Sequence, residues 1–159
     1  MELTGLFING EFVAAEGSAT YPFINPADGQ PWCDFAAASA KDVDRAVAAA
    51  KASFESGVWR NTSAQERAAV LRRAADLFSE YHGQIAMAEI QDSGATLRKA
   101  NGADLIAANL SFQEYANLIE QMPLEQRAEE FFPIASENII RREPVGVVAA
   151  IVPFNFPLA

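Results

Sequence analysis

The sequence contains a single cysteine, Cys33, and a single histidine, His82, among its 159 residues. One cysteine cannot form a disulfide within the chain, and these two residues cannot supply the ligands of a typical structural zinc site. A Ser–His–Asp triad would depend on His82, which lies in a polar helix junction and is expected to be a solvated surface residue. Cys33 has no basic neighbour that would lower its pKa, so we expect a buried structural cysteine rather than a nucleophile.

Positive charge is also scarce, with 12 Lys and Arg against 21 Asp and Glu and a net charge of −9. Without a basic tract, the chain is not expected to bind nucleic acid or an anionic membrane. No apolar run approaches the roughly 20 residues of a membrane span. The N-terminus lacks the basic and apolar regions of a signal peptide, so a cytoplasmic location is expected. The glycine-rich phosphate-binding motifs are absent as well.

Half of the residues are hydrophobic, which is enough to fill a core. The first 37 residues predict a small antiparallel sheet. Leu6–Ile8 and Glu11–Val13 flank Asn9-Gly10, a dipeptide that favours a two-residue hairpin turn. Tyr21–Ile24 and Trp32–Ala37 are predicted to be two further short strands.

Two helices are predicted to begin with capping boxes. Ser39 precedes Asp42 by three residues, and Ser63 precedes Glu66 in the same way. Apolar residues follow both at helical spacing. Gly57 is expected to end the first helix.

Two more helices are predicted, over Gln84–Gln91 with Gly94 as the stop, and over Leu97–Ile119 with Pro123 after its end. Residues 124–130 are polar, and the chain then continues as two extended segments on either side of residues 133–136, with Phe131-Phe132 in the first and Ile139-Ile140 in the second. This pattern predicts a protruding hairpin, which is either an arm that pairs with another subunit or an ordinary surface hairpin.

Val145–Val152 is an almost continuous apolar run, typical of a strand buried on both faces of a parallel sheet. Such a strand needs a partner strand and a crossover connection, and the sequence offers neither after Val152. We therefore expect the rest of this sheet to come from elsewhere, with these 159 residues as the leading part of a longer α/β protein.

Asn155 lies between Pro153 and Pro157, directly after this predicted strand. Ligands bind at the carboxyl ends of strands in open α/β sheets, and the two prolines restrict the backbone on either side of the asparagine. An amide NH2 group aimed in this way suits an oxyanion hole. The alternative is that Asn155 caps a turn or a following helix.

The chain resembles the aldehyde dehydrogenase superfamily. The motif that carries most weight is Glu143-Pro144-Val145-Gly146-Val147 followed by residues 151–158, Ile-Val-Pro-Phe-Asn-Phe-Pro-Leu. Weaker matches run through the chain in the order of the family: residues 6–12, Asn25–Gly29, Asp42–Val47, Trp59-Arg60, Arg67–Ala75 and Gln91–Gly94.

The resemblance implies an oxidation of aldehydes to carboxylic acids that depends on NAD or NADP. In this family a cysteine thiolate attacks the aldehyde, hydride passes to the nicotinamide, and a glutamate activates the water that hydrolyses the thioester. The residue matching Asn155 donates to the thiohemiacetal oxygen. Further matching positions contact the cofactor (Ile151, Val152, Pro153, Phe154 and Asn155), line the aldehyde tunnel (Phe156, Ala107 and Leu110), or form a structural monovalent-cation site in some members (Phe23, Ile24 and Asp92).

The same resemblance implies an incomplete catalytic set, because the nucleophile and the general base of the family lie downstream of the asparagine motif and Cys33 does not match the nucleophile. We expect residues 1–122 to be the N-terminal part of the cofactor domain, 123–143 an oligomerisation arm, and 144–159 the first strand and active-site loop of a Rossmann-like fold. The isolated chain is expected to be inactive, and the full-length form to be a homo-oligomer, dimer or tetramer. Two alternatives are a catalytically dead module that pairs with a full-length enzyme and a reductase of acyl phosphates or acyl thioesters on the same fold.

Overall fold

The N-terminal part of the chain forms two separate hairpins. The computed structural model describes residues 5–129, 133 and 135–158. Strands β1 (Leu6–Ile8) and β2 (Glu11–Val13) pair antiparallel, and so do β3 (Thr20–Ile24) and β4 (Pro31–Ala36). The expected single sheet is therefore wrong, because the turn between β2 and β3 is bonded to a helix and not to a neighbouring strand.

The first turn has the predicted geometry. Asn9 and Gly10 both have positive φ, 55° and 85°, as a type I′ turn requires. In the second hairpin, the ring of Phe23 contacts the rings of Trp32 and Phe35 edge-on, with centroids 5.7 and 5.1 Å apart. These aromatic pairs across the strands stabilise a ribbon that lacks a third strand.

Two long helices begin at the predicted capping boxes. In α1 (Ala40–Ser56) and α2 (Ala64–Glu80), the N-cap serine accepts from the N3 amide and the N3 carboxylate accepts from the N-cap amide. Gly57 ends α1 in the left-handed conformation, with φ of 74°. Val43 and Val47 of α1 remain about half exposed.

The second pair of predicted helices differs in detail. The third helix is longer than expected, α3 (His82–Ser93), and Gly94 ends it with positive φ as predicted. The predicted single helix after Gly94 is instead three pieces: α4 (Leu97–Lys99), the π-helical turn η2 (Ala100–Asp104) and α5 (Leu105–Gln121). None of the helices that the structure describes combines the length and apolar character that a bilayer crossing demands.

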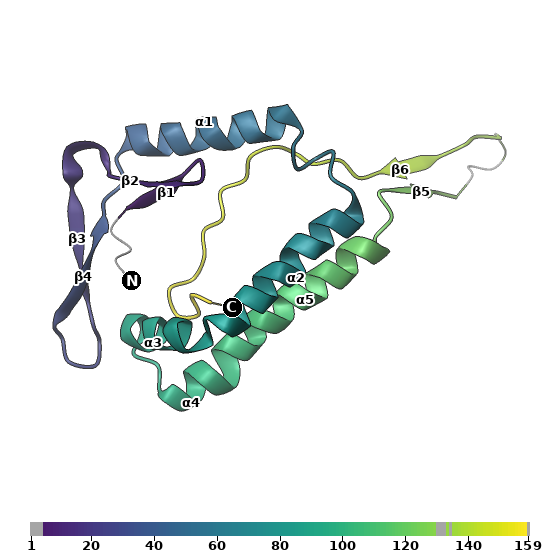
Figure 1. The fold of residues 1–159 in the computed structure, drawn as a ribbon. Helices are drawn as coiled ribbons and strands as arrows, with labels where there is room; N and C mark the ends of the chain where they lie inside the picture. The colour runs from purple at the N-terminus through teal and green to yellow at the C-terminus, as the bar shows by residue number, and fades with distance from the viewer. Residues whose placement is uncertain (1–4, 130–132, 134, 159) are drawn as a thin grey trace.

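Helices α2 and α5 lie side by side and form the centre of the molecule (Figure 1). Their contact is made by small side chains that are at most 4% exposed: Ala68, Ala75, Ala108 and Ala116. The guanidinium of Arg72 binds both carboxylate oxygens of Glu120 across the pair, at 2.9 and 2.6 Å. Close packing and a bidentate ion pair therefore fix the relative position of the two helices.

The predicted arm is a hairpin that projects from the end of α5 (Figure 1). Strand β5 (Glu125–Arg127) pairs with β6 (Ile139–Arg141) in an antiparallel register. Residues 130–132 and 134, which include Phe131 and Phe132, lie outside the described residues. Both strands are exposed along their whole length.

Val145–Val152 is not assigned as a strand in the structure, and its role as the first strand of a parallel sheet stays a prediction, because the partner strands were expected to come from elsewhere. The segment has no ladder partner among the described residues, and it runs back from β6 toward α3 (Figure 1). A strand is defined by its hydrogen-bonded neighbour, and here that neighbour is missing. Val145 and Ile151 are consequently 91% and 95% exposed.

Candidate active-site cleft

The chain turns at residues 154–158, next to α3, α4 and η2. Two contacts hold this turn in place. The side chain of Leu158 packs against the buried cluster of Ala86, Ala100 and Leu105. The ammonium of Lys99 lies 4.6 Å from the centroid of the Phe156 ring, in a cation–π contact. The asparagine singled out in the sequence precedes Phe156 by one residue and is therefore carried by an anchored turn.

A cleft of about 720 Å³ opens on this turn. Its walls come from three regions that are far apart in the sequence: the second hairpin, the link between α3 and α4, and the C-terminal segment. The residues that line it are Phe23, Pro26, Asp92, Ser93, Gly94, Ala95, Thr96, Lys99, Val152, Pro153, Phe154, Asn155 and Pro157. Four of the five predicted cofactor residues are therefore in one cleft, and Ile151 is not.

Asn155 is exposed in this cleft, and its side-chain amide has no hydrogen-bond partner among the described residues. No backbone amide among the described residues donates to this side chain, so Asn155 caps no turn within them, and its role as the cap of a following helix is not tested by these residues. The NH2 group is thus available to an oxygen atom in the cleft.

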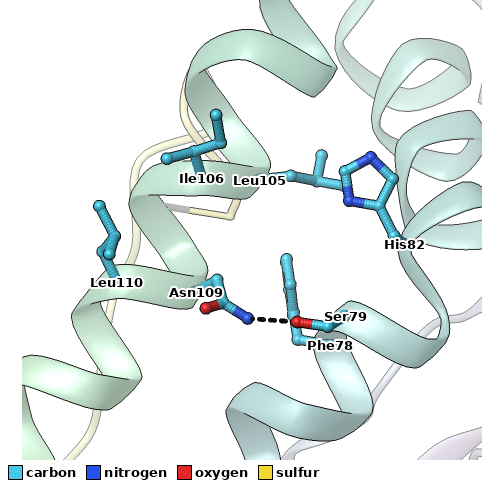
Figure 2. A pocket seen from close by; sticks show the side chains of 7 residues that line it. All are labelled: Phe78, Ser79, His82, Leu105, Ile106, Asn109 and Leu110. Carbon is cyan, nitrogen blue, oxygen red and sulfur yellow. Dashed lines mark hydrogen bonds between the residues drawn. The ribbon is translucent and has the colours of Figure 1, made fainter.

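Of the three predicted tunnel residues, Phe156 lies in the anchored turn next to Asn155 without lining the cleft, and the other two lie on α5. Leu110 lines a separate cavity of about 210 Å³. Figure 2 shows this cavity between Ile106, Asn109 and Leu110 of α5 on one side and Phe78, Ser79 and His82 on the other. The amide of Asn109 closes one end by donating to the hydroxyl of Ser79 at 3.0 Å. Ala107 is exposed on the same helix without lining either cavity.

The predicted cation-site residues are partly together. Phe23 and Asp92 line the cleft that contains Asn155, whereas Ile24 does not. Burial raises the pKa of the Asp92 carboxyl group above its ordinary value. Within residues 5–129, 133 and 135–158, no group of three His, Cys, Asp or Glu side chains could hold a metal ion.

Cys33 is only half-buried, and not buried as predicted, but its environment does not activate the thiol. It lies in β4 opposite Phe23 and is half-buried. Desolvation, together with the negative charges of Asp34 and Asp92, raises its pKa. A thiol with a raised pKa is mostly protonated near neutral pH, and Cys33 is outside the residues that line the Asn155 cleft.

The description of His82 as a solvated surface residue is wrong. The imidazole is half-buried, and its Nε2 lies 2.7 Å from Oδ1 of Asn101 in η2. Three carboxylates on or next to the helices, Asp42, Glu89 and Asp104, are at most 3% exposed. The sequence did not indicate Lys99 and Asp104 as residues near the site. Their contact depends on the π-helical turn, and no residue pattern predicts that turn.

Comparison with known proteins places this arrangement of hairpins, paired helices and cleft in an enzyme family. The profile of the aldehyde dehydrogenase family matches residues 12–159. Cytosolic 10-formyltetrahydrofolate dehydrogenase of Pongo abelii is 39% identical over 96% of the chain, and an NADP/NAD-dependent aldehyde dehydrogenase of Escherichia coli is 38% identical over 96%. The chain spans 17% and 30% of the length of these two relatives.

Solved structures agree with this assignment. An indole-3-acetaldehyde dehydrogenase superposes with a TM-score of 0.89 at 33% identity, over 99% of this chain and 36% of the other. A betaine aldehyde dehydrogenase from Staphylococcus aureus, solved in complex with NAD⁺, gives a TM-score of 0.89 at 31% identity and covers 99% of this chain and 31% of the other. The chain belongs to the aldehyde dehydrogenase family, a family of oxidoreductases, and has the fold of the corresponding part of these enzymes.

Proposed function

We propose that these residues provide the oxyanion donor and part of the nicotinamide site of an NAD- or NADP-dependent aldehyde dehydrogenase that converts an aldehyde to a carboxylic acid. The observation that carries the proposal is the cleft in which Asn155, with an unoccupied amide, lies beside Val152, Pro153 and Phe154. NAD⁺-bound members of the family among the superposed structures support the choice of cofactor.

In this proposal, the amide of Asn155 donates a hydrogen bond to the aldehyde oxygen as it becomes an alkoxide. One such donor stabilises a transition state by about 2.7–4 kcal/mol because it is already oriented before the charge develops. Pro153 and Pro157 limit the backbone conformations around the asparagine, so little reorganisation is needed. The ring of Phe154 and the side chain of Val152 give the cleft an apolar wall beside the donor.

The cleft fits part of a nicotinamide cofactor. The cofactor, when bound, accepts a hydride from the substrate. In this proposal, residues 152–154 contribute apolar side chains and backbone groups to its site. The only cationic side chain that lines this cleft in the described part of the chain, Lys99, is paired with Asp104, so we do not assign the cofactor phosphates to these residues. Cys33 does not serve as the nucleophile, and we place the attacking thiolate and the general base in residues other than these 159.

Two assays test the proposal. A protein made of these 159 residues is expected to form no NADH or NADPH from a panel of aldehydes. A chimera in which they replace the matching segment of the 38%-identical Escherichia coli enzyme is expected to be active. In the chimera, Asn155→Ala should lower kcat by roughly 10²–10³-fold, while Gln84→Ala, an exposed amide on α3, should not. Unchanged kcat in a folded Asn155→Ala chimera would refute the role of the asparagine, and turnover by the 159-residue protein would refute the assignment of the nucleophile.

The 159-residue protein and the chimera also test further proposals. We propose that residues 1–122 are the N-terminal part of the cofactor domain, 123–143 an oligomerisation arm, and 144–159 the first strand and active-site loop of the Rossmann-like fold. We also propose a cytoplasmic location and a homo-oligomer in which the β5–β6 arm pairs with another subunit. Light scattering of the chimera with and without residues 128–138 measures the role of the arm. Reduction of an acyl thioester or acyl phosphate faster than oxidation of any aldehyde would favour the reductase alternative. Co-purification of the 159-residue protein with an intact family member would favour the interaction module.

A further inference from the structure

Lys99 and Asp104 form an ion pair that the helix geometry makes possible. Nζ of Lys99 lies 2.6 Å from Oδ2 of Asp104. In a regular α-helix, five residues span about 500°, so these side chains would point about 140° apart. Here the intervening turn is π-helical, and the amide of Leu105 donates to the carbonyl of Ala100, five residues earlier. The wider turn brings positions i and i+5 onto one face.

The pair is anchored on its acidic side. The side chain of Asp104 is 3% exposed, whereas that of Lys99 is 37% exposed. A buried carboxylate is costly unless a cation and hydrogen bonds accompany it, so Asp104 fixes the position of the Lys99 ammonium and not the reverse.

The anchored ammonium faces the turn that carries Asn155. Its distance to the Phe156 ring is 4.6 Å, and Lys99 also lines the cleft that contains the Asn155 amide. Leu158 packs on Ala100 and Leu105, which bracket the same π-helical turn. The segment from Lys99 to Leu105 therefore contacts both Phe156 and Leu158, the first and third residues after Asn155.

We propose that Lys99, held by Asp104, is a positioning residue that sets the direction of the Asn155 amide through Phe156. This inference rests on the proposed function, because it gives the oxyanion donor its orientation. Lys99 makes no contact with the reacting atoms in this scheme. Its cation fixes the Phe156 ring, and the ring fixes the turn at Asn155.

The contact itself is tested on the 159-residue protein, without any assay of activity. The ring of Phe156 should shift the NMR signals of the Lys99 side-chain methylene protons upfield, and Phe156→Leu should remove this shift. Asp104→Asn should reduce the shift, because the ammonium loses its anchor. An unchanged shift in a folded Asp104→Asn protein would overturn the anchoring step. No shift in the unmodified protein would overturn the contact.

The positioning role is tested in the active chimera. Lys99→Met keeps the length of the side chain and removes its charge, and we expect kcat to fall roughly ten-fold, within the 10²-fold that a 1 Å misplacement costs. The KM for the cofactor should change little, and Lys99→Arg should restore most of the rate. Arg98→Met, the neighbouring exposed cation, is the matched control.

A double-mutant cycle separates positioning from general stability. If Lys99 acts through Asn155, Lys99→Met should have almost no further effect on kcat in the Asn155→Ala background. Independent, additive effects would overturn the proposal while leaving the role of Asn155 intact. A normal kcat in the Asn155→Ala chimera would instead refute the proposed function, whatever Lys99→Met does.

Discussion

The carboxylate of Asp42 accepts a hydrogen bond from the backbone amide of Glu16, 26 residues earlier in the chain, with 3.0 Å between N and Oδ2. The same carboxylate accepts from the amide of Ser39 at 2.8 Å and pairs with the guanidinium of Arg45. Asp42 is therefore both the N3 member of a capping box and the link between the turn before β3 and the start of α1. These bonds, led by the one from Ser39, hold the pKa of Asp42 well below its ordinary range.

We expect Asp42→Asn to lower the melting temperature more than Glu66→Gln, the equivalent change in the second capping box. Glu66 is exposed and accepts hydrogen bonds from Ser63, whereas Asp42 is 1% exposed and also accepts from the amide of Glu16, which lies outside α1. Because the folded-state pKa of Asp42 is depressed, its contribution to stability is complete above the unfolded-state value of about 3.9 and is lost as the pH falls below it.

Thermal melts across acidic pH measure this difference. The gap between the original protein and Asp42→Asn should be constant near neutrality and should narrow as the pH drops below about 4. An equal loss of stability for Asp42→Asn and Glu66→Gln would show that the bond to Glu16 contributes nothing.

Cys33 is expected to react slowly with alkylating reagents. The neutral thiol is favoured in the folded protein because burial and two nearby carboxylates raise the pKa of Cys33, so the rate of reaction with iodoacetamide should rise only above the ordinary thiol pKa of about 8.5. Mass spectrometry should find several-fold faster labelling after unfolding in urea, and none in Cys33→Ser. Rapid labelling of the folded protein at neutral pH would contradict the structural role.

The features that the sequence predicted correctly are local ones. Asn9-Gly10 and the two capping boxes each act within four residues, so their geometry follows from the residues themselves. The cleft residues 152–155 were predicted from a motif and not from packing. By contrast, the apolar run 145–152 needs a sheet partner to become a strand, and residue pattern alone cannot supply one.

The π-helical turn escaped prediction for a related reason. Residues 97–119 have apolar side chains at α-helical spacing on both sides of the turn, and nothing in the local composition indicates a widened turn. The ion pair between Lys99 and Asp104 depends on this turn, as does the position of Asn101 opposite His82. The supporting residues of the candidate site were therefore less predictable than the asparagine itself.

The contact between α2 and α5 should tolerate no larger side chain at its centre. Ala68 is fully buried there, and its neighbour Ala69 is exposed on the same helix. We expect Ala68→Leu to lower the free energy of unfolding by about 1–3 kcal/mol, because overpacking forces the helices apart. Ala69→Leu should change it by less than about 0.5 kcal/mol. Urea denaturation followed by circular dichroism measures both, and equal effects would argue against close packing at this point.

Leu110 offers a test of whether the aldehyde passes along α5. Its side chain lines the cavity that also contains Phe78 and His82, and it does not line the cleft of Asn155. Its substitution should therefore weaken binding of the substrate chain without changing the contacts of the reacting carbonyl group.

In the active chimera, we expect Leu110→Ala to raise the KM for a long aliphatic aldehyde roughly ten-fold, the loss that follows from removing methylene contacts in an apolar site. The KM for acetaldehyde and both kcat values should remain within about two-fold, because transition-state contacts are intact. Glu114→Gln, at an exposed position of the same helix that lines neither cavity, is the matched control. If Leu110→Ala lowers kcat equally for short and long aldehydes, the side chain acts on helix packing and not on the substrate, and the tunnel must run elsewhere.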